Sequence, residues 1–216
     1  MKTDYKKTRK EFYAPRAGVP GIVRVPRMNF LMISGKGRPE EESFQQGVQT
    51  LFPAAYVMKF LWKARRPAED FTVMPLEVKW RLDRSRRAPE RFQWTMMVMQ
   101  PDAVTADLLR DALHLLARKK KYVPFAERLR VQTFKEGLCG QMLYIGPYGK
   151  PMDTAFGRVK QKILESGYQP ELDSHDIYFN DIRRTAPEKL RTLMRVRIWE
   201  AEKPQPVWED PFIGGE

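Results

Sequence analysis

The order of secondary-structure signals repeats along this chain, and the repeat limits the possible folds more than any single motif does. In each half, an extended run is followed by a helical pattern and then by two strand-like runs. The expected strands are 21–39, 71–82 and 91–100, then 130–149, 175–181 and 190–200, with helices at 40–66 and 150–167. This doubled unit predicts an α+β fold of two βαββ modules in a pseudo-twofold arrangement. We expect a mostly antiparallel sheet with helices on one side and a ligand cleft between the modules.

The length of the chain fits one domain of this kind. Its 216 residues are enough to bury a proper core. We therefore assign residues 1–216 to a single domain, in which the first module covers about 20–100, a connecting helix 101–122, the second module 123–200 and a C-terminal tail 201–216.

A few residues carry local expectations inside these elements. Pro53 should kink or restart the first helix, because proline has no amide hydrogen to donate. Gly137 and Gly140 predict a bulge or a close approach in the strand at 130–149. Gly167 is expected to stop the helix at 150–167.

Several classes of protein and site are disfavoured by the composition. The longest apolar runs fall short of the roughly 20 residues that a membrane helix needs, so we expect no membrane insertion. The single Cys139 excludes an internal disulfide and a cysteine-cluster metal site, which fits a reducing cytoplasm. Since His114 and His175 are the only histidines, we expect no metal, and no nucleotide fingerprint indicates a cofactor.

The formal net charge of +12 raises the question of an anionic partner. Basic residues cluster at 63–66, 81–87 and 118–122, and such clusters suit either nucleic-acid phosphates or solvated turns and helix ends. The last cluster closes an expected helix whose acids come early, a polarity that complements the helix dipole without any ligand. Only about twenty residues precede the first expected strand. We therefore expect no specific nucleic-acid partner and no direct transcriptional control.

The stretch "HDIYFNDIRR" at 175–184 has an unusual pattern for a strand. Side chains alternate faces in a strand, so Asp176, Tyr178 and Asn180 should share one face, with His175 on the other. An ordinary strand would turn apolar groups inward. A carboxylate among aromatic rings attracts lipophilic organic cations through its charge and through the ring faces. The alternative interpretation is that Asp176 only satisfies a nearby arginine or tyrosine.

Five segments together resemble a known family. They are "VPRMNFLMISGKG", "PLEVKW", "FQWTMMVMQPDAVT", "YIGPYG" and "HDIYFNDIRRTAPEKLRTLMR". They are similar to the stand-alone GyrI-like small-molecule-binding domain, which is related to the effector-binding domains of multidrug-sensing regulators. The resemblance implies two βαββ modules in pseudo-twofold arrangement. It also implies binding of lipophilic, often cationic, compounds, and some stand-alone members hydrolyse cyclopropane-containing cytotoxins.

The chain departs from the family pattern at positions that matter for hydrolysis. The family's last motif usually carries a glutamate where this chain has Asp176. Hydrolytic members have a second glutamate after the Gly-Pro-Tyr turn, where this chain has Gly149 and Lys150. Glu77 matches another family acid, and the tryptophan usual after the one at Trp80 is Arg81.

The leading hypothesis is a binding domain for hydrophobic small molecules, cationic ones included. The expected ligand-binding residues are Tyr56, Glu77, Trp80, Tyr148, Asp176 and Tyr178. The alternative is a hydrolase of cyclopropane-containing cytotoxic compounds, for which Asp176 and Glu77 are the catalytic candidates. The identity of the ligand and the oligomeric state stay open at this stage.

Overall fold

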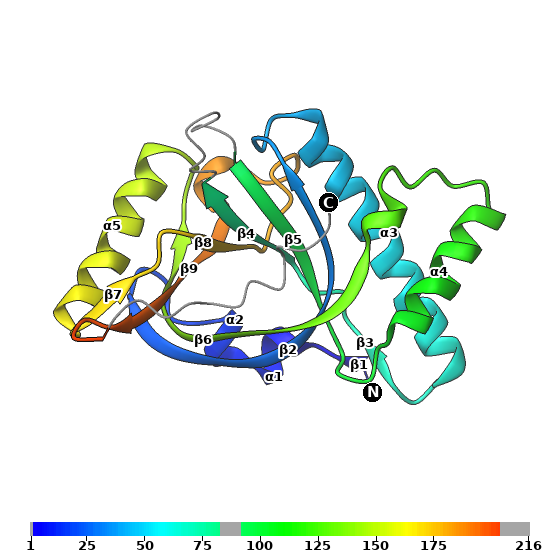
Figure 1. Cartoon of the computed structure of the whole chain (residues 1–216), viewed down its shortest axis with the longest axis horizontal. Coiled ribbons are helices and arrows are strands. Elements are labelled where there is room, and N and C mark those ends of the chain that lie inside the picture. Colours follow the sequence, from blue (N-terminus) through cyan, green and yellow to red (C-terminus); the bar gives the residue numbers. More distant parts are fainter. Residues whose placement is uncertain (1, 83–91, 204–216) are drawn as a thin grey trace. The chain divides into compact units, whose positions relative to one another are not determined.

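A computed structural model describes residues 2–82 and 92–203 of the chain (Figure 1). The basic turn expected at 83–90 and most of the tail lie outside the described residues. In chain order the elements are β1 (Lys2–Thr3), α1 (Tyr5–Thr8), α2 (Lys10–Tyr13), β2 (Gly21–Lys36), α3 (Glu42–Arg65), β3 (Asp70–Phe71), β4 (Leu76–Leu82), β5 (Phe92–Gln100), α4 (Ala106–Arg118), η1 (Ala126–Arg128), β6 (Arg130–Ile145), α5 (Lys150–Glu165), β7 (Tyr168–Pro170), β8 (Ser174–Tyr178), η2 (Pro187–Lys189) and β9 (Arg191–Glu200).

The repeated order of elements is confirmed. The first half contains β2, α3, β4 and β5, and the second half contains β6, α5, β8 and β9. The strand pairs described below are antiparallel, so the α+β class with a mostly antiparallel sheet is confirmed as well. The sequence did not predict the short strands β3 and β7. The ligand cleft between the modules stays a prediction.

Contacts divide the chain into two compact units. Each unit contains segments from both the first and the second half of the sequence. Unit 1 contains residues 1–8, 28–74 and 82–134, and unit 2 contains 9–27, 75–81 and 135–216. Strand β4, which comes from the first half of the chain, therefore belongs to unit 2 together with β8 and β9.

Unit 1 is built on an antiparallel pair of strands with two helices. Strand β2 pairs with β5 from Asn29 opposite Gln100 to Lys36 opposite Gln93. Helices α3 and α4 lie side by side (Figure 1). Helix α3 does not restart at Pro53 but runs through it. Burial of the α3 side chains around Pro53 explains why the helix survives one missing backbone hydrogen bond.

Unit 2 contains a four-stranded antiparallel arrangement in the order β4, β8, β9, β6. Val78 pairs with Asp176 across the first two strands, and Asp176 pairs with Met194 across the next two. Strand β6 joins the other edge of β9 from Cys139 opposite Arg197 to Ile145 opposite Arg191. Since directly paired residues point to the same face, this register fixes which side chains can meet.

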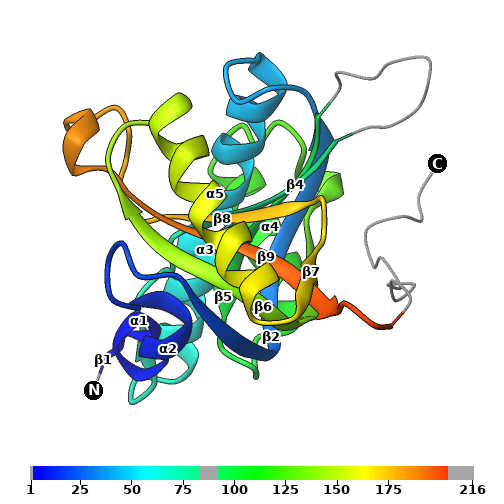
Figure 2. The ribbon, with the colours of Figure 1, turned by 90° about the vertical axis from the view of Figure 1, so that its left-hand side faces the viewer.

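Helix α5 covers part of one face of this sheet, where it crosses β6 and β9 (Figure 2). Val159 and Ile163 of α5 pack against Met142 and Met194 of the strands. Gly140 allows this close approach, because a Cβ atom there would lie 2.5 Å from the Ile163 Cδ1 atom. The close approach expected at Gly140 is therefore confirmed, while Gly137, with φ +83°, adopts the backbone conformation that favours glycine, and the bulge expected there stays a prediction.

Gly167 follows α5 with φ +79°, and the expected helix stop is therefore confirmed. Among the described residues, no helix combines the length and the apolar composition required to cross a bilayer.

Candidate functional site

The register of unit 2 sorts the candidate residues onto two faces of the sheet. Asp176 pairs with Val78, so the face that contains Asp176 also contains Trp80 and Tyr178, at alternate positions of their strands. We call this the front face. Glu77 pairs with Ile177 and Lys79 pairs with His175, so these four side chains belong to the opposite, rear face.

The front face brings a carboxylate and three aromatic rings together. The Trp80 Nε1–H group donates to the Tyr178 hydroxyl oxygen at 3.2 Å, and that hydroxyl donates to Asp176 Oδ2 at 3.3 Å. The Tyr148 ring meets the Tyr178 ring edge to face, with centroids 5.9 Å apart and planes at 89°. Asp176 is buried, whereas the three aromatic side chains are half-buried and so partly accessible to solvent.

The electrostatics of this front cluster are those of a poorly solvated acid. Burial raises the pKa of Asp176 to about 6, although the positive charge of His175 and the hydrogen bonds from Tyr178 and Trp80 act in the opposite direction. Burial and the neighbouring Asp176 carboxylate raise the pKa of Tyr178 well above its usual value. Burial also raises the pKa of Tyr148, against an interaction with the Thr192 hydroxyl.

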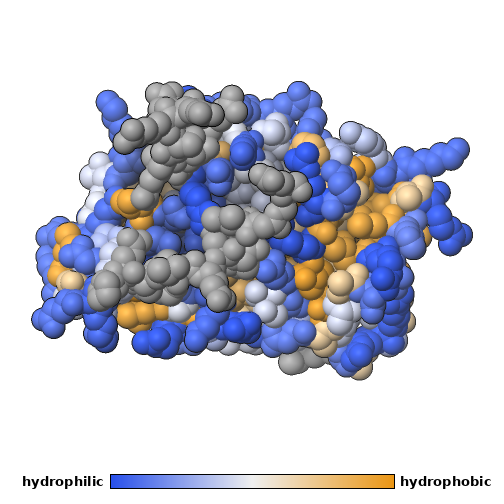
Figure 3. Space-filling model, viewed as in Figure 1, coloured by the Kyte–Doolittle hydropathy of each residue, from blue (hydrophilic) through white to orange (hydrophobic). Residues whose placement is uncertain are grey.

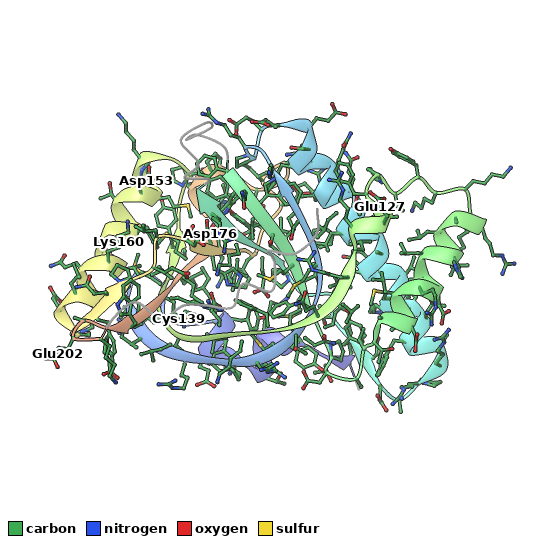
Figure 4. All side chains as sticks on the ribbon, in the orientation of Figure 1. Glu127, Cys139, Asp153, Lys160, Asp176 and Glu202 are labelled. Atoms are coloured by element: carbon green, nitrogen blue, oxygen red, sulfur yellow. The ribbon has the colours of Figure 1, made fainter. Side chains whose placement is uncertain are left out.

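Figure 4 shows Asp176 on β8 among the side chains of unit 2, whereas Asp153 and Lys160 extend outward from α5. The described residues provide Asp176 with no ion pair to a lysine or an arginine. Its stabilising partners are therefore the neutral Tyr178 and Trp80 and, across the sheet, the charge of His175.

Tyr56 lies on α3 in unit 1, whereas the front-face residues belong to unit 2. Its side chain is 49% exposed and its ring contacts Phe52, with centroids 6.5 Å apart. Phe60, one turn further along α3, is 60% exposed, and apolar surface gathers on the side where α3 and α4 lie (Figure 3). The structure therefore supports an accessible aromatic at Tyr56, but it does not describe Tyr56 as part of the Asp176 cluster.

Glu77 is fully buried on the rear face and does not meet Asp176. The Tyr13 hydroxyl of α2 donates to Glu77 Oε1 at 2.8 Å. The other oxygen, Oε2, lies 3.2 Å from His175 Nε2, close enough for an ion pair but outside hydrogen-bond geometry. The two acids that the sequence proposed as partners thus lie on opposite faces of one sheet.

The rear-face contacts continue from His175 into a buried chain of charges. His175 Nδ1 donates to Glu136 Oε1 at 2.8 Å, and the Arg195 guanidinium donates to Glu136 Oε2 at 3.0 Å. Arg195 also donates to Gln141 Oε1 and to the Phe12 carbonyl oxygen. We call Tyr13, Glu77, His175, Glu136 and Arg195 the rear network.

Opposite charges set the protonation states in the rear network. Burial alone would raise the pKa of Glu136, but His175 and Arg195 hold it well below its usual value. Burial alone would lower the pKa of His175, but Glu136 and Glu77 raise it to about 9. His175 is therefore an imidazolium at neutral pH, and two cations balance two carboxylates in a site closed to solvent.

The rear network does not have the character of a metal site. Within residues 2–82 and 92–203, no group of three or more histidine, cysteine, aspartate or glutamate side chains is arranged to hold a metal ion. Cys139 is buried, and burial raises the pKa of its thiol, so it is a structural thiol rather than a nucleophile.

The family is decided by a direct match. The family model of the GyrI-like small-molecule-binding domain matches residues 19–198. The chain belongs to the GyrI-like family. No curated protein matches the chain.

Solved structures agree with this assignment. A crystal structure of a hydrolase from Listeria innocua is 34% identical, covers 91% of this GyrI-like chain and 99% of its own, and has a TM-score of 0.80. An uncharacterized conserved protein from Listeria innocua is 33% identical, with coverages of 91% and 99% and a TM-score of 0.82. The EcmrR C-terminal domain, at 10% identity, coverages of 84% and 98% and a TM-score of 0.50, shows likeness of fold alone.

Sequence reasoning missed most of the rear network of this GyrI-like domain. Arg195 lies between Met194 and Val196 in β9, and a charge in such an apolar run was the available signal, whereas Glu136, between Lys135 and Gly137, gave none. Tyr13 gave no signal, because it lies outside the two predicted modules and outside the family match at 19–198. Arg81, where the family usually has tryptophan, forms an ion pair with Asp173 at 3.1 Å.

Proposed function

We propose that this GyrI-like domain binds hydrophobic small molecules, lipophilic cations among them, against the front cluster of Trp80, Tyr148, Asp176 and Tyr178. The observation that carries the proposal is a buried carboxylate under three half-buried rings, with neutral hydrogen-bond donors on its own face. The family match supports a small-molecule ligand. The single, buried cysteine fits a cytoplasmic location for this activity.

The chemistry of the front cluster favours a cation with an apolar body. An ionised Asp176 is poorly solvated, so a cation beside it gains a strong electrostatic attraction. The ring faces add cation–π attraction and apolar contact area. A neutral ligand of the same shape gains only the ring contacts, which makes Asp176 the residue that separates the two ligand classes.

Glu77 and Tyr56 take different roles in this proposal. Glu77 is buried on the rear face and acts through the strands rather than by touching the ligand. Tyr56 belongs to the other unit, and its predicted role as a ligand wall is tested directly by Tyr56→Ala. A loss of affinity in that variant supports the role, and unchanged affinity removes Tyr56 from the site.

The proposal is tested by calorimetric titration with a cationic rhodamine and with an uncharged aromatic compound of similar size. Trp80→Ala should weaken both ligands by about 1–3 kcal/mol, because an aromatic wall is lost. Asp176→Asn should weaken the rhodamine much more than the neutral compound. The matched control is Asp153→Asn, which removes an exposed carboxylate of α5 in the same unit. Absence of saturable binding across a panel of such compounds would refute the proposal.

The second candidate function is hydrolysis of cyclopropane-containing cytotoxic compounds. The observation that favours it is the 34% identity to a Listeria innocua protein described as a hydrolase. Against it, Gly149 and the exposed Lys150 stand where the hydrolytic pattern requires an acid, and Glu77 does not share a face with Asp176. Addition of water to a strained ring benefits from paired acid and base groups.

We therefore predict that the domain binds cyclopropane-bearing toxins without appreciable turnover, as measured by chromatographic product analysis. A missing acid–base partner is typically worth about 10²–10⁴-fold in rate. The double change Lys150→Glu with Asp176→Glu should raise hydrolysis, whereas Lys160→Glu, on an exposed part of α5, should not. Efficient hydrolysis by the unchanged protein would instead make the hydrolase the correct assignment.

A further inference from the structure

His175 is placed to act on the ligand site from the other side of the sheet. It is adjacent to Asp176 in β8, so the two side chains lie on opposite faces of the same strand. Its ring is 2% exposed and is held between Glu136 at 2.8 Å and Glu77 at 3.2 Å. The Nδ1 hydrogen bond to Glu136 and the second carboxylate oxygen near Nε2 both favour the imidazolium form.

We propose that His175 is a positioning residue that keeps the neighbouring Asp176 carboxylate charged for a cationic ligand. The inference rests on the proposed function, since it assigns a role to the charge of Asp176 in binding. It gives the rear network a role beyond stability, because the network holds the charged His175 ring next to a carboxylate whose hydrogen-bond donors on its own face are neutral.

The charged groups around these two residues are defined. His175 faces Glu77 and Lys79 of β4, Glu136 of β6 and Arg195 of β9. Lys79 forms an ion pair with Glu171 at 3.8 Å, so the positive charge of Lys79 is balanced by a carboxylate of its own. Asp176 faces Trp80, Tyr148, Tyr178 and Thr192, which are neutral at pH 7.

This arrangement predicts the direction in which two substitutions shift the pKa of Asp176. His175→Gln removes a positive charge behind Asp176, so the carboxylate should be harder to ionise. Glu77→Gln removes a negative charge from the same network while Glu136 still holds His175 protonated, so Asp176 should be easier to ionise. Structural damage would move both variants the same way, whereas electrostatics moves them in opposite directions.

The experiment is a titration of the Asp176 carboxyl carbon by NMR in the full chain without ligand, together with rhodamine affinity measured from pH 4.5 to 8.5. We expect the Asp176 midpoint to rise by about one pH unit in His175→Gln and to fall by a similar amount in Glu77→Gln. The midpoint of rhodamine binding should move with it. Asp153→Asn, on the outer side of α5, should leave both midpoints unchanged.

The outcomes separate this inference from the proposed function. If the Asp176 midpoint is the same in the wild type, His175→Gln and Glu77→Gln, the role of His175 is overturned even if rhodamine binds. Shifts of the same sign in the two variants would overturn it as well. If His175→Gln does not fold, Glu77→Gln alone decides, since a downward shift supports the role and an unchanged midpoint rejects it. If the NMR shifts appear but rhodamine binds to no variant, the electrostatic role stands and the proposed ligand class fails.

Discussion

Asp176 combines burial with a small set of neutral donors, and this combination determines how it can be used. A glutamate at this position would reach one methylene further from the strand, whereas the aspartate carboxylate stays close to the Tyr178 hydroxyl at 3.3 Å. The acid is therefore held by its own strand neighbour and by Trp80 rather than by a basic side chain. Such a group loses its charge in the mildly acidic range, which gives the site a measurable pH dependence.

The first prediction concerns that pH dependence. Because the pKa of Asp176 is about 6, rhodamine affinity should be full at pH 7.5 and should fall as pH drops through 6, where the carboxyl protonates. The neutral aromatic compound should keep its affinity over the same range. Affinity is measured by fluorescence titration at each pH. Asp176→Asn should flatten the rhodamine curve, and a curve that keeps its shape in this variant would assign the titration to another group.

At the scale of elements, α5 and α2 hold opposite faces of the same sheet. Helix α5 packs on the front side of β6 and β9 through Val159 and Ile163. Helix α2 contacts the rear face, where Tyr13 donates to Glu77 and the Phe12 carbonyl oxygen accepts from Arg195. The sheet to which β4 and β8 belong is therefore supported on its front face at β6 and β9 and on its rear face at β4 and β9.

The second prediction tests the α5 contact. Gly140→Ala should destabilise the protein by about 1–3 kcal/mol, because the new methyl group would lie 2.5 Å from Ile163 and the core would have to shift. Gly157→Ala is the matched control, since a Cβ atom there meets nothing within 4 Å, and it should stabilise α5 by about 0.5–1 kcal/mol. Urea unfolding measures both. Equal effects of the two changes would mean that α5 does not approach β6 as closely as described.

The third prediction tests the α2 contact. Tyr13→Phe keeps the ring but removes the hydroxyl that donates to Glu77, leaving a buried carboxylate oxygen without its donor. We expect a loss of about 1–3 kcal/mol in the free energy of unfolding. Tyr122→Phe, at a side chain that is 82% exposed, provides a comparison for loss of a tyrosine hydroxyl. Tyr13→Phe with wild-type stability would show that α2 is not anchored through Glu77.

At the scale of the whole molecule, a protein with a net charge of +12 keeps its two best-buried cations in a neutral cluster. His175 and Arg195 are balanced by Glu77 and Glu136. The excess positive charge lies elsewhere, largely on exposed residues such as those at the end of α4. The stability of the fold should therefore depend on pH mainly through the buried cluster rather than through the surface charge.

The fourth prediction gives the sign of that dependence. The pKa of His175 is raised to about 9 in the folded protein, above its ordinary 6.5, so its contribution is fully present below pH 6.5 and is lost as pH rises through 9. The contribution is on the order of 3 kcal/mol. Urea unfolding from pH 6 to 10 should show the loss in the wild type and a much flatter curve in His175→Gln. Parallel curves for the two proteins would assign the pH dependence to other groups.

Local pattern was enough to determine the elements and the direction of several side chains. The order of strands and helices in each half follows from hydrophobic periodicity, and the alternation in "HDIYF" places Asp176 and Tyr178 on one face of β8. The roles of Gly137, Gly140 and Gly167 also follow from residue type, because glycine adopts a positive φ without steric cost and has no Cβ atom to clash with a close neighbour. These are properties of short segments, so they follow from the sequence without knowing which other strands or helices pack against each segment.

Strand register and tertiary packing decided the rest. No periodicity shows that Glu77 pairs with Ile177 and so turns away from Asp176, because register depends on which strands meet. The same pairing places His175 beside two glutamates 98 and 39 residues away in the chain, and Tyr13 closes the network from outside both predicted modules. A buried charge is stable only with its counter-charges, and these lie in other strands. The sequence therefore determined which residues face together along one strand, and only the tertiary structure decided which charges meet across the sheet.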